Sequence, residues 1–299
     1  MAVAPKVREA PPLAIPRQIA PRPERRLRIP RTWAVRFGLI VAALLFLLPF
    51  YWMANSALKD LQELSAFPPT LYPHTPAWAN FQRAVTYIPF GTFLLNSIIL
   101  TTGVTLGAAI SNPLIAYGFS RIQWPGRDFV FGIVLATIFL PFPVLIVALF
   151  DIFAKLGWID TFLPIIVPAF FGNPFFIFLM RQFLLGLPSE ISEQARIDGA
   201  NEFQVFFHII LPLAKPAIAV VVIFAAVQAW GEFLTPLLFL QDESKYPLSI
   251  GLQFYRQEHD VAYNLLMAAS SLIVLPIVAL FLAFQRFFIQ GVTVGAVKG

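Results

Sequence analysis

Six apolar stretches, each long enough to cross a lipid bilayer as a helix, dominate this sequence. A hydrocarbon core about 30 Å thick needs roughly 20 mainly apolar residues per helical span. Hydrophobic residues make up 58% of the chain and charged residues 12%, against about 25% charged residues in soluble domains. The sequence therefore predicts an all-α membrane protein with six transmembrane helices, at about 36–58, 91–118, 129–150, 164–181, 213–239 and 264–285.

The basic residues give the orientation of these spans. Of the 21 Lys and Arg residues, all but five fall before the first span, in the second and fourth connections, or after the last span. Cytoplasmic segments carry the excess of positive charge in membrane proteins. The pattern therefore predicts that both termini are cytoplasmic and that the loops at 59–90, 151–163 and 240–263 are external. These external loops contain the five remaining basic residues, Lys59, Arg83, Lys155, Lys245 and Arg256.

The predicted domain organisation is a single membrane domain with two cytoplasmic tails. Residues 1–35, rich in Pro and Arg, are expected to be a disordered basic tail that can lie against anionic lipid headgroups. The first apolar run exceeds the 7–15 residues of a signal-peptide core, so cleavage is not expected. Residues 36–285 form the six-span domain, and residues 286–299 form a Gly-rich tail. Prolines at positions 141, 143, 168 and 174 predict kinks in the third and fourth spans.

Several classes of function are disfavoured by composition. The chain has no cysteine, and its three histidines are too far apart to form a local metal motif. The phosphate-binding pattern G-x-x-x-x-G-K-[ST] does not occur, so an energy source on another polypeptide is expected if transport is active. The positive charge is explained by membrane orientation, and nucleic acid is not an expected partner.

A polar island at 189–212, "SEISEQARIDGANEFQVFFHIILP", interrupts the apolar sequence on the predicted cytoplasmic side. Ser189 can cap a helix whose first turn carries Glu190 and Glu193. Gly199 can adopt the left-handed conformation that ends a helix, and a second short helix is expected to stop at Pro212. The whole connection, about 182–212, is longer than the 2–8 residues typical between bundle helices. It therefore predicts a binding segment, with a helix resting on lipid headgroups as the alternative.

The island closely resembles the cytoplasmic loop motif of ABC importer permeases. That pattern runs Glu-Ala-Ala, three residues, Gly, and then about nine residues to Ile-x-Leu-Pro; Gln194 departs from it, and the matching residues are Glu193, Ala195, Asp198, Gly199, Ala200, Ile209 or Ile210, Leu211 and Pro212. The stretches at 96–128 and 230–239 and the ending "FIQGVTVGAVKG" are similar to carbohydrate permeases of the maltose-transporter MalG type. The resemblance therefore points to a sugar importer.

The resemblance implies a type I ABC importer permease fold with a cytoplasmic coupling helix. The implied partners are a second homologous permease, a dimer of ATPase subunits that bind ATP and Mg, and an extracytoplasmic solute-binding protein. This chain would bind no cofactor and would not be an enzyme. It would lie in a bacterial or archaeal plasma membrane, and its ATPase-coupling residues would be Glu193, Gln194, Ala195, Arg196, Asp198, Gly199 and Ala200.

Polar residues within the spans are candidates for the substrate path. Glu232 lies toward the outer end of the fifth span, where an acid suits either a polar cavity or an interfacial position. Sugar sites combine aromatic faces with amides or acids, which also suggests Asn96, Asn112, Gln228 and Trp230; ordinary helix packing is the alternative for each. Two other functions stay open at this level: a secondary transporter driven by an ion gradient, which would need acids in mid-span, and a membrane scaffold.

Overall fold

The computed structural model describes residues 33–256 and 261–296, without the side chains of Ala34 and residues 286–296. The described residues are helical, apart from loops and one isolated antiparallel bridge between Arg256 and Val261. The chain divides into two units, residues 1–48 and 49–299, which are described separately. The first helix, α1 (Trp33–Ala57), begins slightly before the predicted start at residue 36, and the rest of the predicted 1–35 tail lies outside the described residues.

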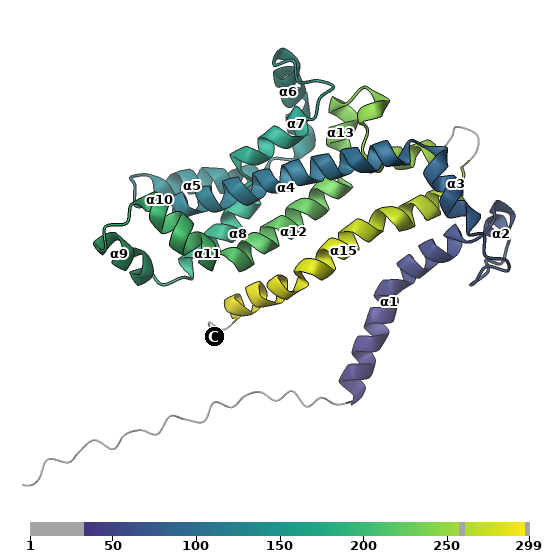
Figure 1. The fold of residues 1–299 in the computed structure, drawn as a ribbon, viewed down its shortest axis with the longest axis horizontal. Helices are drawn as coiled ribbons and strands as arrows, with labels where there is room; N and C mark the ends of the chain where they lie inside the picture. Colours follow the sequence, from purple (N-terminus) through teal and green to yellow (C-terminus); the bar gives the residue numbers. More distant parts are fainter. Residues whose placement is uncertain (1–32, 257–260, 297–299) are drawn as a thin grey trace, which may run out of the picture. The chain divides into compact units, whose positions relative to one another are not determined.

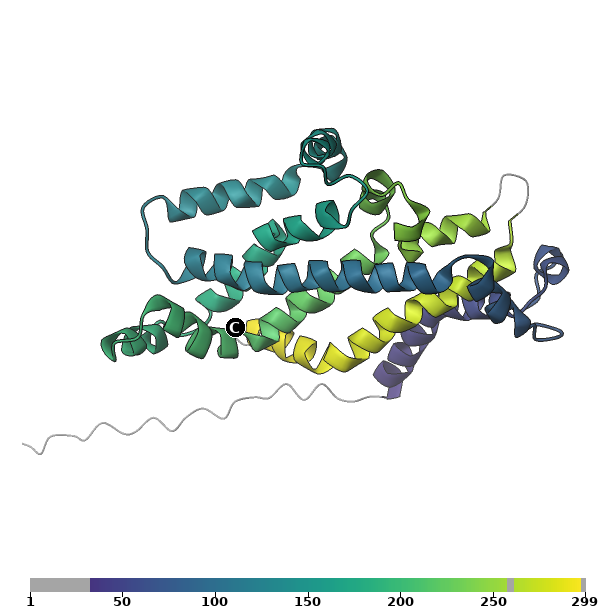
Figure 2. The same ribbon diagram turned by 45° about the horizontal axis from the view of Figure 1, so that its top comes forward.

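Within residues 49–299, the long helix α4 (Phe90–Ser120) is the centre of the packing. It contacts α8 (Pro174–Leu185) and α12 (Lys215–Gly231), and α12 in turn packs on α15 (Tyr263–Ala296). Figure 1 draws α4 as one uninterrupted helix, and Figure 2 shows α5 beside it on one side and α12 and α15 on the other. Gly103 and Gly107 permit α4 to pack closely against a further segment, α7 (Leu163–Ile166) and η2 (Val167–Phe171), because a Cβ at either position would lie within 3.0 Å of Ile166 or of Ala169 and Phe170.

Four helical segments of the described residues are long and apolar enough to cross a membrane: Val35–Ala57, Phe90–Ser120, Leu163–Leu185 and Tyr263–Gln285. Two bent helix pairs raise this number to six if each pair is one span: Arg127–Phe139 with Phe142–Lys155, and Glu202–Leu213 with Lys215–Gly231. These segments fall on the six apolar stretches of the sequence. Two of the predicted spans are therefore bent rather than straight.

The third predicted span, 129–150, is not a single straight helix. Helix α5 (Arg127–Ala136) continues into the 3-10 turn η1 (Thr137–Phe139), and α6 (Phe142–Lys155) leaves at 102°. The break lies at Pro141, whose ring removes a backbone donor and forces Leu140 into an extended conformation, with ψ 114°. The kink predicted from Pro141 is confirmed, whereas Pro143 lies in the first turn of α6, where proline is tolerated.

The fourth predicted span is made of α7 (Leu163–Ile166), the 3-10 helix η2 (Val167–Phe171) and α8. The interruption falls at Gly172, whose φ of +91° is in the region that favours glycine. Asn173 then caps α8 by accepting hydrogen bonds from the backbone N–H groups of Phe175 and Phe176. Pro174 is the first residue of α8, where a backbone N–H is not needed.

The fifth predicted span, 213–239, is also interrupted. Helix α12 ends at Gly231, Glu232 is extended with ψ 124°, and α13 (Leu234–Phe239) follows. On the other side, α10 (Glu202–Gln204), the π-helix η3 (Val205–Ile210) and α11 (Leu211–Leu213) form one helical segment that bends by 75° at Ala214 into α12. The prediction that Pro212 ends this helix is wrong, because Pro212 lies in the first turn of α11 and the helix continues to Leu213.

The remaining short elements lie in the predicted external loops. They are α2 (Leu61–Ser65), α3 (Ala79–Tyr87), η4 (Glu243–Lys245), α14 (Leu248–Gly251) and η5 (Leu252–Tyr255). The last helix, α15, is helical to Ala296, past the predicted boundary at 285. The predicted tail 286–299 is thus helical at first, and residues 297–299 lie outside the described part.

Buried side chains form a core at each end of α4. One core joins α3, the first turn of α4, α14, η5 and α15, with Phe93 and Tyr255 completely buried. The other joins the last turns of α4 to α8, η3 and α12, with Met180 and Val221 completely buried. The second core supports the polar segment between α8 and α12, which Figure 1 shows at the C-terminal end of α4.

Candidate functional site

The polar segment folds as two short helices joined at a glycine, as predicted. Helix α9 spans Glu190–Ile197, with Asp198 as its C-cap and Gly199 at φ +88° directly after it. Acidic residues in the first turn and Arg196 in the last turn match the helix dipole. Ser189 is the N-cap residue but its side chain makes no capping hydrogen bond, so that detail of the prediction is wrong.

The second helix begins with a reciprocal cap that the sequence analysis missed. The side chain of Asn201 accepts a hydrogen bond from the backbone N–H of Gln204 at 2.9 Å, and the side chain of Gln204 accepts one from the backbone N–H of Asn201 at 2.9 Å. The signal is present in the sequence as Asn-Glu-Phe-Gln, which is a capping box. Together with Gly199 it fixes where α10 starts relative to α9.

The predicted coupling residues divide into exposed and buried members. Glu193, Gln194, Asp198 and Gly199 are exposed, Arg196 and Ala200 are partly buried, and Ala195 is buried in the core formed with α8, η3 and α12. The small side chain of Ala195 therefore permits packing within the chain itself. Two large apolar side chains beside the exposed residues, Ile197 and Phe203, are 84% and 72% exposed, which makes this surface suited to contact with another protein.

A polar cluster ties this segment to α4. The Arg196 guanidinium donates from Nε to Oε1 of Glu202 at 2.6 Å and from Nη2 to Oε2 at 3.2 Å, and the Tyr117 hydroxyl donates to Oε2 at 2.5 Å. The hydrogen bond to Glu202 raises the pKa of Arg196, so the pair stays charged. Sequence analysis did not find Tyr117 or Glu202, because nothing in the sequence indicates that residues this far apart come together.

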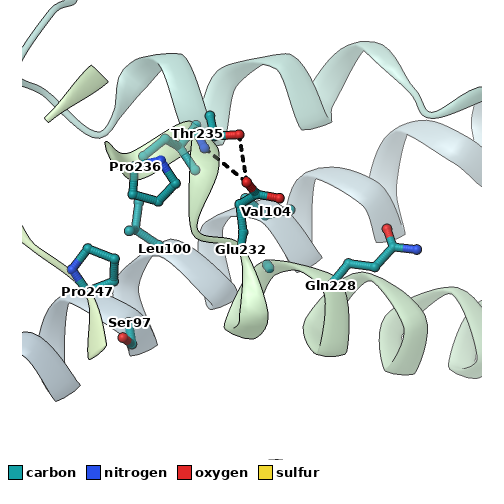
Figure 3. Close-up of a pocket in the computed structure, with 10 residues that line it drawn as sticks. Ser97, Leu100, Val104, Gln228, Glu232, Thr235, Pro236 and Pro247 are labelled. Carbon is teal, nitrogen blue, oxygen red and sulfur yellow. Dashed lines mark hydrogen bonds between the residues drawn. The ribbon is translucent and has the colours of Figure 1, made fainter. Parts of the chain in front are cut away.

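A cavity of about 190 Å³ lies between α4, α7, α12 and α13 (Figure 3). Its walls include Gln228, in the last turn of α12, and Glu232, the residue directly after that helix. Two of the five predicted substrate-path residues are thus brought to one cavity, and its full lining is Ser97, Leu100, Val104, Ile165, Gln228, Ala229, Glu232, Thr235, Pro236 and Pro247.

Glu232 is held in a defined orientation in this cavity. Its Oε1 accepts hydrogen bonds from the backbone N–H of Thr235 at 2.9 Å and from the Thr235 hydroxyl at 3.0 Å, as drawn in Figure 3. Its backbone oxygen accepts a hydrogen bond from the Ser249 hydroxyl at 2.7 Å. The side chain sits at the interruption between α12 and α13, so the carboxylate is presented by a bend rather than by the middle of a helix.

The other three predicted substrate-path residues do not line this cavity. Asn96 donates to the backbone oxygens of Ser244 and Tyr246, at 2.8 and 3.0 Å, and ties α4 to the loop predicted to be external at 240–263. The other two also make hydrogen bonds within the fold. Asn112 is completely buried, donating to Ala108 O and accepting from Asn173 N, and Trp230 donates from its indole to Ile273 O on α15.

A second polar cluster joins two of the predicted external loops. The carboxylate of Asp160 accepts hydrogen bonds from the backbone N–H groups of Gln241 and Asp242, both at 2.9 Å, and from the Lys245 ammonium at 2.5 Å. The Lys245 ammonium and then the two backbone N–H groups lower the pKa of Asp160 to about 2. The cluster holds the loop after α6 against the loop after α13.

Among the described residues, no group of three or more His, Cys, Asp or Glu side chains is arranged to hold a metal ion. The polar features of this part of the chain are therefore the α9–α10 segment, the cavity at Glu232 and the Asp160 cluster. The first is an exposed contact surface and the second is an internal cavity.

Comparison with known proteins agrees with this arrangement. Residues 103–294 match the family model described as "Binding-protein-dependent transport system inner membrane component". The chain is 33% identical to the arabinooligosaccharides transport system permease protein AraQ of Halalkalibacterium halodurans, over 90% of this chain and 97% of that protein. It is 31% identical to the trehalose/maltose transport system permease protein MalG of Thermococcus litoralis, over 88% and 95%.

A solved structure shares the fold. It is described as a bacterial ABC transporter involved in the import of the acidic polysaccharide alginate, and it aligns with a TM-score of 0.71 at 23% identity, covering 86% of this chain and 98% of the matched chain. The family match spans most of the residues that line the cavity, from Val104 on, together with the α9–α10 segment and most of α15. This chain therefore belongs to the family of inner membrane components of binding-protein-dependent transport systems.

Proposed function

We propose that this chain is the transmembrane permease subunit of an ATP-driven, binding-protein-dependent sugar importer. The observation that carries the proposal is the exposed α9–Gly199–α10 segment, located between two apolar helices of a chain that belongs to this transport family. Relatives are named for the transport of arabinooligosaccharides, trehalose/maltose and sn-glycerol-3-phosphate. A sugar or a related polyol derivative is the substrate class that these names have in common.

Six membrane crossings with both termini in the cytoplasm form the architecture of the proposal. One bent pair, Arg127–Phe139 with Phe142–Lys155, is taken as one span, and the other crosses with its second helix, α12, while its first part with α10 stays on the cytoplasmic side; with the four longer helices this gives six spans. The Lys and Arg distribution supports this orientation in a bacterial or archaeal plasma membrane. The loops at 59–90, 151–163 and 240–263 then face the solute-binding protein, and the Asp160 cluster holds the second of these loops against the third.

Helix α9 is the proposed coupling helix. Its exposed residues, with Ile197 and Phe203, dock on one subunit of an ATPase dimer, while Ala195 anchors the helix to the rest of this chain. ATP and Mg bind on those partner subunits, so this chain needs no cofactor and performs no hydrolysis. ATP-driven closure of the dimer displaces α9, and the displacement changes which side of the membrane the solute path opens to.

The cavity at Glu232 is this chain's part of the solute path. Carboxylate and amide oxygens accept hydrogen bonds from hydroxyl groups, and Glu232 and Gln228 supply both kinds of oxygen to one cavity. A second, homologous permease subunit completes the path. The acid is at a helix interruption rather than in mid-span, which supports a binding role over a proton relay.

The test is to purify the chain from its host together with the proteins that co-purify with it, and to reconstitute the complex in liposomes. Recovery of an ATPase, a second permease and a solute-binding protein is expected, together with ATP-dependent uptake of a labelled sugar from a panel of maltose, trehalose and arabino-oligosaccharides. Recovery of the chain alone under crosslinking, or uptake that follows an ion gradient without ATP, would contradict the proposal.

A further inference from the structure

The two helices that wall the Glu232 cavity are linked to α9 in different ways. Helix α12 carries Gln228 and leads directly into Glu232, and it is joined to α9 by the chain itself, through α10, η3, α11 and the bend at Ala214. Helix α4 carries Ser97, Leu100 and Val104 on the opposite wall and has no such connection, because it precedes α9 by two spans. Arg121, directly after α4, donates hydrogen bonds to the backbone oxygens of Leu184 and Leu187 ahead of α9. Movement of both walls together with α9 also needs a link from α4 to the α9–α10 segment itself.

The Arg196–Glu202–Tyr117 cluster supplies this link. Arg196 lies in the last turn of α9, Glu202 in the first turn of α10, and Tyr117 in the last turn of α4, where its side chain is buried. The ring of Tyr117 also packs against Phe206, with ring centroids 5.1 Å apart. Apolar contacts of this kind permit sliding, whereas hydrogen bonds to a carboxylate are directional and short.

Both oxygens of Glu202 are engaged at once. Oε1 accepts from Arg196, and Oε2 accepts from both Arg196 and Tyr117. The Glu202 carboxylate is a rigid planar group that is bonded to both side chains. A displacement of Arg196 therefore moves the carboxylate, and the carboxylate moves the Tyr117 hydroxyl. Tyr117 lies 20 residues from Ser97 along α4, a distance of about 30 Å at 1.5 Å per residue, and Figure 1 shows this helix without interruption.

We infer that Tyr117, Glu202 and Arg196 form a clasp that makes α4 follow α9, so that both walls of the cavity respond to one displacement. The inference rests on the proposed docking of α9 on an ATPase. Tyr117 and Glu202 are positioning residues: they touch neither ATP nor solute, and they act by holding α4 to the moving helix. Loss of the clasp leaves α12 connected to α9 by the chain, whereas α4 keeps its packing and the Arg121 hydrogen bonds to the segment before α9 but no hydrogen bond to Glu202.

The absence of cysteine allows a direct test with pairs of spin labels, using ATP and Mg²⁺ as the only added ligands. Labels at Glu190→Cys on α9 and Leu106→Cys on α4, both at exposed positions, report whether the two helices move together. Labels at Glu190→Cys and Leu275→Cys on α15 report whether α9 moves at all. The measurement is made on the reconstituted complex.

In the native chain, ATP is expected to shift the α9–α15 distance and to leave the α9–α4 distance unchanged. Tyr117→Phe removes one hydroxyl and keeps the buried ring, so the complex is expected to assemble and the α9–α4 distance to shift with ATP. Transport per ATP hydrolysed should fall roughly tenfold, the factor that corresponds to one charge-assisted hydrogen bond. Ser120→Ala is the matched control, because that hydroxyl donates only to Tyr117 O within α4, and it should behave as the native chain does.

The possible results separate the clasp from the proposed function. No ATP-dependent shift of the α9–α15 distance in the native complex would overturn the docking role of α9. A normal α9–α15 shift with an α9–α4 distance that stays constant in Tyr117→Phe would overturn the clasp alone. Glu202→Gln provides a second variant. If both residues act through one clasp, transport per ATP in the double variant should fall by less than the product of the factors for Glu202→Gln and Tyr117→Phe alone. Independent losses that multiply in the double variant would also overturn the inference.

Discussion

Gly199 gives the sharpest prediction about the coupling segment, because the cost of replacing it comes from the backbone alone. Its φ is +88°, and a Cβ built at this position meets nothing within 4 Å. Alanine or valine here would therefore not clash with the fold. Each would instead disfavour the turn that sets the direction of α10 relative to α9.

The size of this effect follows from the left-handed conformation. An L-residue with a Cβ costs about 1–2 kcal/mol in this region, and a β-branched residue costs more because it is a genuine outlier there. A change of one or two kcal/mol alters a conformational equilibrium by a factor of about 5–30. We therefore expect Gly199→Ala to lower the population of the native turn by about that factor, and Gly199→Val to lower it further. Gly199→Asn should be milder, since Asn tolerates this conformation.

The assay compares uptake per ATP hydrolysed in the reconstituted complex, with membrane insertion checked by expression level. The Gly199→Val chain should remain inserted in the membrane. The complex that contains it should hydrolyse ATP but take up less sugar per ATP than the native complex. Gly157→Ala is the matched control: its φ is +69°, its Cβ would also meet nothing within 4 Å, and it lies in a predicted external loop. Normal uptake per ATP for Gly199→Val at normal expression would refute the reasoning.

Three further predictions concern stability and assembly. Asn112→Ala should lower the free energy of unfolding by about 1–3 kcal/mol, because the backbone N–H of Asn173 loses the acceptor that the buried Asn112 side chain supplies; an unchanged thermal midpoint in detergent would contradict this. The pKa of Asp160 is lowered to about 2 in the folded chain. Its stabilising contribution is therefore complete above the unfolded pKa of about 3.9 and is lost as the pH falls through about 2. The difference in thermal midpoint between Asp160→Asn and the native chain should shrink between these two pH values, and a constant difference would contradict this role of Asp160. Removal of residues 288–299 should reduce the yield of complex with the ATPase or change its regulation, and unchanged yield and ATPase response on pull-down would disprove that role.

The positions of the apolar helices could be predicted from composition because hydropathy acts over about 20 residues. Their interruptions were harder to place. Pro141 breaks the third span as a proline should, yet the sequence does not give the 102° bend that follows, since the angle depends on what α5 and α6 pack against. The end of α12 at Gly231 has only a glycine to mark it, and the hydropathy continues through it to Phe239.

Within the candidate site, local features were predictable and distant pairings were not. Gly199 could be assigned a left-handed conformation because the requirement is set by its own backbone. Asn96 and Asn112 were interpreted as substrate-path residues because a polar side chain in an apolar run suggests function. In the structure, Asn96 donates a hydrogen bond to a backbone oxygen in the predicted external loop at 240–263, and Asn112 accepts one from the backbone N–H of Asn173 at the break before α8. No local sequence pattern reveals these partners.

The size of the Glu232 cavity limits what this chain can hold by itself. Ligand pockets typically measure about 300–1,000 Å³, and the cavity between α4 and α12 measures about 190 Å³. A disaccharide would therefore not be enclosed by these walls alone. A second subunit must therefore add its own surface. In the proposed importer a homologous permease completes the path, and α4 and α12 open it by moving together relative to that permease. The carboxylate fixed by Thr235 then serves as one polar contact on a shared path rather than as a complete binding site.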